Sequence, residues 1–136
     1  MPLYSRRGAG GPCFWLDTAH SFVANGYVGV GDDGASTINV NIVPWVAPCN
    51  GTLLNMRVQG LTNANSTVHI TIYKASASSN PSYASTALTT TVSFGSATGS
   101  DTTHSVSVSG GDMVVAFSDA VWNVNGAAIT CQFVPT

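Results

Sequence analysis

Histidine and aspartate side chains are the groups in this sequence that could carry out chemistry. The chain has three histidines, His20, His69 and His104, and six aspartates but no glutamate. A histidine beside a carboxylate and a nucleophile would indicate acyl transfer, because the imidazole moves the proton and the carboxylate orients the ring. Asp17 and His20 are close enough in sequence to pair across one turn. No recognised motif places a nucleophile beside them, so the sequence predicts that the protein is not an enzyme.

The other two histidines have simpler explanations than catalysis. His69 falls on the polar face of a predicted strand, where an exposed histidine is the ordinary outcome. His104 follows Asp101-Thr102-Thr103 in a predicted turn. Local hydrogen bonds from an aspartate side chain explain a histidine at this place as well as catalysis would.

Carboxylates could also serve a glycoside hydrolase as a pair, or bind a divalent cation. Asp32-Asp33-Gly34 is similar to part of a calcium loop, but it lacks the alternating oxygen ligands and the closing glutamate. Asp112 follows a pair of glycines and is explained more simply by a hairpin turn. The other carboxylates are scattered along the chain. The sequence therefore predicts no metal site and no cofactor.

The cysteines Cys13, Cys49 and Cys131 are odd in number and form no Cys-x-x-Cys pair. A disulfide framework normally has an even and denser set. We therefore expect reduced, buried, structural thiols, with a single Cys13–Cys49 bridge as the alternative. Reduced thiols are typical of proteins that fold in the cytosol.

Charged residues are unusually few. They make up 7% of the 136 residues, against about 25% in an ordinary soluble domain. A formal net charge of −2 favours neither nucleic acid nor an anionic membrane surface as a partner. No apolar stretch reaches the roughly 20 residues of a membrane helix, and no apolar region follows the basic N-terminus as it would in a signal peptide. We expect synthesis in the cytoplasm without a signal peptide, and a surface that either presents Ser, Thr, Asn and Gly to water or is largely covered by partners.

Alternation of apolar and polar residues predicts β-strands and no long helix. The pattern is clearest over residues 37–42, 54–59 and 68–73, and weaker over 26–31, 86–94, 104–109, 112–118 and 127–134. Turn sequences such as Asn50-Gly51 and Asn125-Gly126 separate these segments. About eight antiparallel strands at this spacing predict an all-β, two-sheet sandwich of the jelly-roll type.

The sandwich is expected to be a single domain over residues 13–136, with residues 1–12 as a flexible N-terminal arm. The arm is rich in glycine and carries Tyr4, Arg6 and Arg7, which could bind a neighbouring subunit. A frayed terminus is the alternative. The bulky patch that follows, with Phe14 and Trp15, is expected to cover one open end of the sandwich or to contact a partner.

Aromatic residues outside the strands are the remaining candidates for binding. Trp45 lies between Pro44 and Pro48, in an irregular segment that is a poor candidate for the central core. A tryptophan in such a place could be an anchor in a protein interface, because it buries a large rigid surface. The other tryptophans, Trp15 and Trp122, are equally well explained by packing in or beside the core.

Three stretches of the sequence, residues 46–58, 67–74 and 105–115, resemble a known class of proteins. They are Val-Ala-Pro-Cys-Asn-Gly-Thr-Leu-Leu-Asn-Met-Arg-Val, Thr-Val-His-Ile-Thr-Ile-Tyr-Lys and Ser-Val-Ser-Val-Ser-Gly-Gly-Asp-Met-Val-Val. Together they are similar to small jelly-roll proteins of tailed-bacteriophage virions, above all the head decoration, or cement, proteins. Similar patterns occur in the trimeric tips of phage fibres and of spore-surface fibres. The resemblance covers residues 25–134 and marks a way of folding rather than a binding motif.

The resemblance implies a viral structural protein on the outer surface of the capsid. Such a protein would form dimers or trimers, bind the major capsid protein and bridge neighbouring capsid subunits, without nucleic acid or membrane as a partner. The alternative is a receptor- or carbohydrate-binding tip module of a phage tail fibre or surface fibre. The candidate contact residues are Tyr4, Arg6, Arg7, Phe14, Trp15 and Trp45.

Deletion of residues 1–11 tests the arm. The sandwich should remain folded, because this segment has no strand pattern. Binding to capsids should weaken, because Tyr4, Arg6 and Arg7 are lost. Circular dichroism reports the fold and co-sedimentation with capsids reports the binding. Unfolding of the truncated protein would mean that the arm is part of the core, and unchanged binding would mean that the arm makes no contact.

Overall fold

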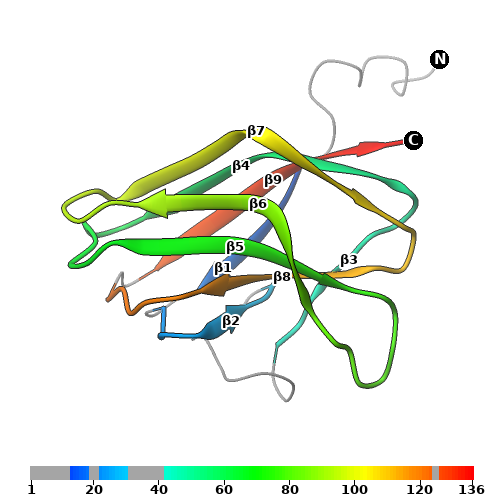
Figure 1. The fold of residues 1–136 in the computed structure, drawn as a ribbon, viewed down its shortest axis with the longest axis horizontal. Helices are drawn as coiled ribbons and strands as arrows, with labels where there is room; N and C mark the ends of the chain where they lie inside the picture. The colour runs from blue at the N-terminus through cyan, green and yellow to red at the C-terminus, as the bar shows by residue number, and fades with distance from the viewer. Residues whose placement is uncertain (1–12, 19–21, 31–41, 124–125) are drawn as a thin grey trace.

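A computed structural model of the chain describes residues 22–30, 42–123 and 126–136, together with the backbone of residues 13–18. The described residues form nine strands and no helix (Figure 1). The strands are β1 (Cys13–Thr18), β2 (Gly26–Val28), β3 (Trp45–Val46), β4 (Gly51–Gly60), β5 (Val68–Ala75), β6 (Ala84–Val92), β7 (Thr98–Val108), β8 (Met113–Ser118) and β9 (Ala127–Pro135).

The strands form two antiparallel sheets, which confirms the predicted sandwich. One sheet has the order β1-β9-β4-β7, and the other has the order β2-β8-β5-β6 with the short β3 beside β8. The pairs β1–β9, β2–β8, β4–β7 and β5–β6 are nested within one another along the sequence. This is the order that results when one long hairpin is rolled up, and it supports the jelly-roll prediction.

Burial follows the predicted alternation. In β5, Val68, Ile70 and Ile72 are fully buried, whereas the residues between them are exposed or half-buried. In β9, Ile129 and Phe133 are buried in the same alternating way. Successive side chains of a strand point to opposite faces of its sheet, so these residues meet between the two sheets and form one core.

Strand β1 and strand β3 differ from the sequence-based expectation. Residues 13–16 were expected to be a cover or a contact patch before the first strand, but they are part of β1, which pairs with β9. Phe14 is opposite Cys131 and Trp15 is opposite Thr130. Trp45 lies in a short strand rather than in an irregular segment. The prediction of a strand over 37–42, like that of the arm, lies outside the described residues apart from Ile42.

Asn55 creates a bulge in the middle of β4. It is an additional residue relative to β9, between the pairs Leu54–Gln132 and Arg57–Thr130. Its φ is 53°, in the left-handed region that asparagine tolerates better than most residues. The Asn55 Nδ2 atom donates to Gln132 Oε1 at 2.8 Å, which joins the bulge to the neighbouring strand.

Two further bulges lie on the edge strands β6 and β7. Residues 86–88 of β6 lie opposite Ile72 alone, and residues 102–104 of β7 lie opposite Asn55 alone. Each of these strands is the last in its sheet, and the two strands contact each other where the sheets come together. The bulges therefore occur side by side along one long side of the sandwich.

Phe22 and Trp122 close one end of the core. Their backbones form an isolated bridge, with N–O distances of 3.0 and 3.1 Å. Both side chains are fully buried, and their rings stack with centroids 5.5 Å apart. The Trp122 Nε1 atom donates to the carbonyl oxygen of Thr62 at 3.2 Å, so the buried indole has a hydrogen-bond acceptor.

Substitution of Trp122 by alanine should lower the free energy of unfolding by about 3–5 kcal/mol, because it leaves a large cavity beneath the loops. The neighbouring Val121 is 45% exposed, and Val121→Ala should change the free energy of unfolding by at most about 0.5 kcal/mol. Urea denaturation followed by circular dichroism measures both. Equal losses in the two variants would contradict the assignment of Trp122 to the core.

Candidate interaction surfaces

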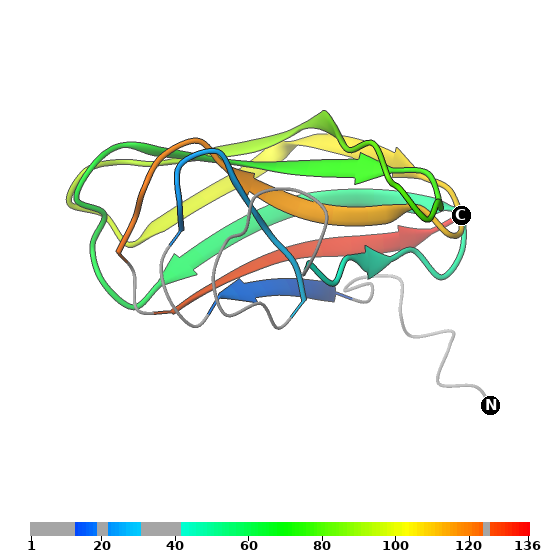
Figure 2. The same cartoon turned by 90° about the horizontal axis from the view of Figure 1, so that it is seen from below.

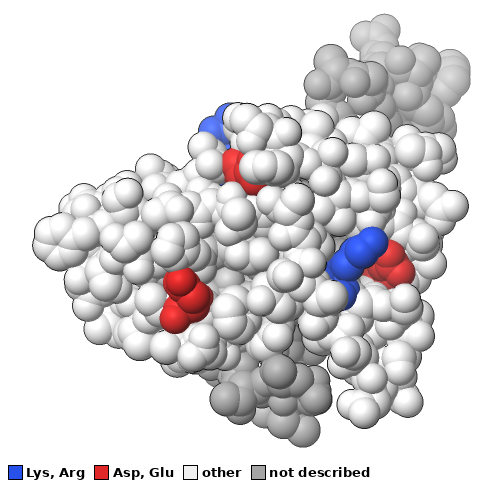
Figure 3. Space-filling view, in the orientation of Figure 1, with Lys and Arg blue, Asp and Glu red and all other residues white. Residues whose placement is uncertain are grey.

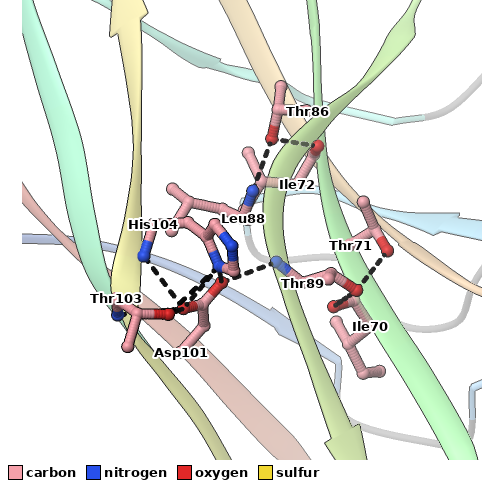
Figure 4. Close-up of polar contacts among 9 residues, drawn as sticks. All are labelled: Ile70, Thr71, Ile72, Thr86, Leu88, Thr89, Asp101, Thr103 and His104. Atoms are coloured by element: carbon pink, nitrogen blue, oxygen red, sulfur yellow. Dashed lines mark hydrogen bonds and ion pairs between the residues drawn. The ribbon is translucent and has the colours of Figure 1, made fainter.

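The buried carboxylate of Asp101 joins the two edge strands (Figure 4). Its Oδ2 accepts the backbone N–H of Thr89 in β6 at 3.1 Å. Its Oδ1 accepts the backbone N–H groups of Thr103 and His104, each at 3.1 Å, and the Thr103 hydroxyl at the same distance. The His104 ring lies 2.9 Å from Oδ2 through Nδ1. The local contact expected for His104 is therefore present, within a bulged strand rather than a turn.

The protonation of Asp101 follows from these contacts. Burial acts to raise the pKa of the carboxyl, because it disfavours the charged form. The hydrogen bonds from the amides of Thr103, Thr89 and His104, and from the His104 ring, outweigh burial and hold the pKa well below its ordinary range. The carboxylate is therefore ionised at neutral pH and fully engaged in holding strands together.

Threonine hydroxyls continue this polar region into β5. The Thr86 hydroxyl in the β6 bulge donates to Ile72 O at 2.7 Å and accepts the Leu88 N–H at 3.3 Å. The hydroxyls of Thr71 and Thr89 are 2.8 Å apart across the β5–β6 pair. The Thr86 hydroxyl thus satisfies backbone atoms that the bulge leaves without strand partners, and the Thr89 hydroxyl also donates to Ile70 O at 3.3 Å, as Figure 4 shows.

The other described histidine, His69, is paired with Asp119 on the surface. The His69 Nδ1 atom lies 2.6 Å from Asp119 Oδ2, and the Asp119 Oδ1 accepts the His69 N–H at 2.7 Å. Both side chains are about half exposed. The pair fastens the end of β8 to β5 and is separate from the Asp101 region. The remaining histidine, His20, lies outside the described residues.

The structure describes only part of the predicted contact set. The three arm residues, Tyr4, Arg6 and Arg7, lie outside the described residues. For Phe14 and Trp15 the structure describes only the backbone, which pairs with β9. Trp45 is half-buried at the margin of the core. Its ring meets the buried ring of Phe133 edge to face, with centroids 5.4 Å apart. Part of its surface therefore contributes to folding.

A group of exposed apolar side chains gathers at one end of the sandwich, which we call the loop end. Leu61 and Phe94 are 76% and 73% exposed, in the β4–β5 and β6–β7 connections. Val121 in the β8–β9 connection and Val23 before β2 are 45% and 38% exposed. In Figures 1 and 2 these connections lie at the left, and the C-terminus lies at the right. Sequence reasoning named none of the four as a contact residue, and it placed Phe94 in a predicted strand over 86–94, whereas β6 ends at Val92.

Hydrogen bonds hold the connections of the loop end against one another. The Leu61 N–H donates to Gly126 O at 3.0 Å, and the Gly95 N–H donates to Ala64 O at 2.8 Å. The Ser66 hydroxyl donates to Val121 O at 3.2 Å. Beneath them lies the buried Trp122. Loops fixed in this way present their exposed side chains with little loss of conformational entropy on binding.

Four aromatic rings form a second group, on the outer face of the β2-β8-β5-β6 sheet. Tyr27 lies between Tyr73, Tyr83 and Phe117, with centroid distances of 5.5, 5.9 and 5.2 Å, and Tyr73 and Phe117 are 4.9 Å apart. Burial, and to a smaller extent Tyr73, raises the pKa of Tyr27. The alternation in β5 predicts from the sequence that Tyr73 points away from the core. The sequence does not predict that the other three rings lie beside it, because that depends on the order of the strands in the sheet.

Two hollows with polar walls are also present. One, of ≈ 370 Å³, lies between the end of β5, the start of β6 and the β7–β8 turn. The other, of ≈ 580 Å³, lies on the outer face of the β1-β9-β4-β7 sheet around Arg57, Gln59, Ser100 and Thr130. The face of the molecule in Figure 3 has few charged groups on a largely uncharged surface.

The thiols differ from the expectation in one respect. Cys131 is buried, as predicted, but Cys49 is exposed and forms no disulfide bond. Cys49 lies directly before the turn Asn50-Gly51 that starts β4, and a connection at the surface covers it less than a strand in the core would. The prediction of a buried thiol is therefore wrong for Cys49.

Among the described residues, no three His, Cys, Asp or Glu side chains are grouped so that they could hold a metal ion. Within the same residues there is no helix with the length and apolar character needed to span a membrane. No protein-family model matches the chain, and a search of curated proteins finds no matching sequence.

The Asp101 carboxylate should make stability depend on pH in a defined direction. Because its pKa is lowered on folding, its contribution is present above the ordinary aspartate pKa of about 4 and is lost as the pH falls further. Asp101→Asn should lower the free energy of unfolding by about 1.5–3 kcal/mol at pH 7 and should flatten the decline below about pH 4.

Asp119→Asn is the matched control, because its half-exposed pair with His69 should contribute at most about 1 kcal/mol. Urea denaturation at a series of pH values measures both variants. An Asp101→Asn protein that is as stable as the unchanged protein at pH 7 would contradict the structural role of this carboxylate.

Proposed function

We propose that this protein is a viral structural protein that binds the outside of a phage capsid and stabilises it by bridging neighbouring major capsid proteins. The observation that carries the proposal is the loop end, where Phe94, Leu61 and Val121 are exposed on connections that hydrogen bonds hold in place. Large exposed apolar side chains on a rigid surface with few charges are typical of protein interfaces. The resemblance of three sequence stretches to decoration proteins supports the capsid as the partner.

The energetics suit a protein that acts by binding alone. Burying one exposed leucine or phenylalanine side chain contributes about 1.5–3 kcal/mol. Two or three such side chains give a modest interface, which many copies on one shell multiply. The described aspartates Asp101, Asp112 and Asp119 are each held in hydrogen bonds to the backbone. In the proposed role these aspartates stabilise the sandwich and take part in no catalytic step.

The low number of charged residues also bears on whether the protein acts as a single copy or as an oligomer. A surface with few charged groups is poorly suited to staying dispersed as single copies. We therefore infer that the protein acts as a homo-dimer or homo-trimer on the outer surface of the virion. Its partners would be further copies of itself and the major capsid protein, without nucleic acid or a membrane.

A tip module of a tail fibre or surface fibre is the second candidate. The observation that favours it is the position of the loop end relative to the C-terminus. Strand β4 begins at Gly51, beside Pro135, and ends at Gly60, beside Ala127. The loop end thus lies at the far end of the sandwich from residue 136 (Figure 1). A module attached through that terminus would present Leu61 and Phe94 to a receptor.

Particles assembled with and without the protein test the two candidates. With the decoration role, DNA-filled particles that carry the protein should rupture at a higher temperature than bare particles. Phe94→Ser and Leu61→Ser should each weaken binding to bare particles about tenfold or more, because they remove proposed anchors. Binding should change little between low and moderate salt, because few ion pairs are available.

Val46→Ser is the matched control, because Val46 is 52% exposed but lies in β3, beside Met113 of β8 and away from the loop end. It should bind particles as the unchanged protein does. Equal rupture temperatures with and without the protein would overturn the decoration role. If the bare particles also failed to adsorb to cells, the fibre-tip candidate would replace it.

A further inference from the structure

The smaller hollow has walls of an unusual composition. Three segments line it: the end of β5 with Lys74, the start of β6, and the β7–β8 turn with Asp112. The other lining residues are four serines and two alanines, Ser76, Ser82, Ser85, Ser109, Ala75 and Ala84. Its ≈ 370 Å³ falls within the range of about 300–1,000 Å³ that is usual for small-molecule sites.

Hydrogen bonds to backbone and side-chain atoms hold the turn on one side of the hollow in place. The Asp112 Oδ2 atom accepts the Ser109 N–H at 2.9 Å, and the Gly110 N–H donates to Asn50 Oδ1 at 2.8 Å. The Ala47 N–H donates to Asp112 O at 2.9 Å, and the Gly111 N–H donates to Ala47 O at 2.8 Å. A wall fixed in this way does not have to be ordered when a ligand binds.

Lys74 and Asp112 place a donor and an acceptor side by side. The Lys74 ammonium donates to Ser107 O at 2.7 Å and lies 4.0 Å from Asp112 Oδ2. An ammonium group has three N–H bonds, so it retains donors for a ligand. The Asp112 side chain is 13% exposed, and its carboxylate can accept hydrogen bonds beyond the one from Ser109.

We propose that this hollow binds a neutral sugar ring. Each hydroxyl of a sugar both donates and accepts, which matches an ammonium beside a carboxylate and serine hydroxyls that can take either role. The lysine disfavours a cation and the aspartate disfavours an anion, because each would meet a like charge. An apolar ligand would leave these polar groups without partners. The exposed Ala84 adds an apolar contact for the C–H groups of the ring.

The site lies at the end of the sandwich away from the loop end, because Ser109 and Asp112 follow Val108, which pairs with Gly51 at the start of β4. The proposal does not depend on the decoration role or on the fibre-tip role. In either setting, sugar binding would be an activity additional to the contacts of the loop end, and it would let the protein attach weakly to a glycan-covered surface.

Titration of the ¹⁵N-labelled protein with methyl α-glycosides of glucose, galactose and mannose tests the proposal. At least one glycoside should cause saturable shifts of the amide signals of residues 74–76, 82–85 and 109–112, with a millimolar Kd. Asp112→Asn should weaken that binding about tenfold, because it removes a charged acceptor but keeps an oxygen for the Ser109 N–H.

Ser82→Trp and Ser79→Trp form a matched pair in the exposed β5–β6 loop. Ser82 lines the hollow and Ser79 does not. Ser82→Trp should abolish the shifts by filling the hollow, whereas Ser79→Trp should leave the Kd unchanged. The proposal is overturned if none of the three glycosides gives saturable shifts. It is equally overturned if glucuronate binds more tightly than all of them, or if Ser82→Trp binds sugar normally.

Discussion

Along one long side of this sandwich, the buried carboxylate of Asp101 joins the two sheets. Asp101 belongs to the last strand of one sheet, and through Thr89 it accepts a hydrogen bond from the last strand of the other. The bulges of both strands are formed around it. Removing such a charge from water is costly unless hydrogen bonds replace the lost hydration. Here several backbone amides and a histidine ring donate these hydrogen bonds to Asp101. The position of the two edge strands depends on these bonds.

The rest of the molecule contains very few other charged residues. Most of its polar groups are threonine, serine and asparagine side chains, which satisfy the backbone at bulges and connections. As a result, exposed apolar residues such as Leu61 and Phe94 have no charged neighbours within their own connections, residues 61–67 and 93–97. A rigid sandwich whose β4–β5 and β6–β7 connections carry no charge is a suitable platform for association, and this links the composition of the chain to its proposed role.

The amino-acid sequence locates the cleanly alternating strands well, and it also locates β8, predicted over 112–118 and observed over Met113–Ser118, but it misses or shortens others. Strands β5 and β9 have apolar residues at every second position, and both were located to within two residues. Strand β1 was missed because Cys13-Phe14-Trp15-Leu16 is continuously apolar, and β7 was predicted too short because its first half lacks apolar residues. The loop end could not be found at all. Leu61 and Phe94 are 33 positions apart in the sequence, and only the nested strand order brings their connections together.

The bulges of β6 and β7 also affect which neighbours the sandwich can accept. An edge strand with regular, exposed N–H and C=O groups can add a strand from another molecule, which leads to open-ended aggregates. Here the two edge strands lie against each other, and Asp101 occupies the Thr89 N–H that a foreign strand would need. Bulged strands also match a regular partner poorly. Another molecule therefore cannot extend either sheet on this side. Many proteins protect an edge strand with charged side chains, whereas here the backbone geometry of the bulges has this role.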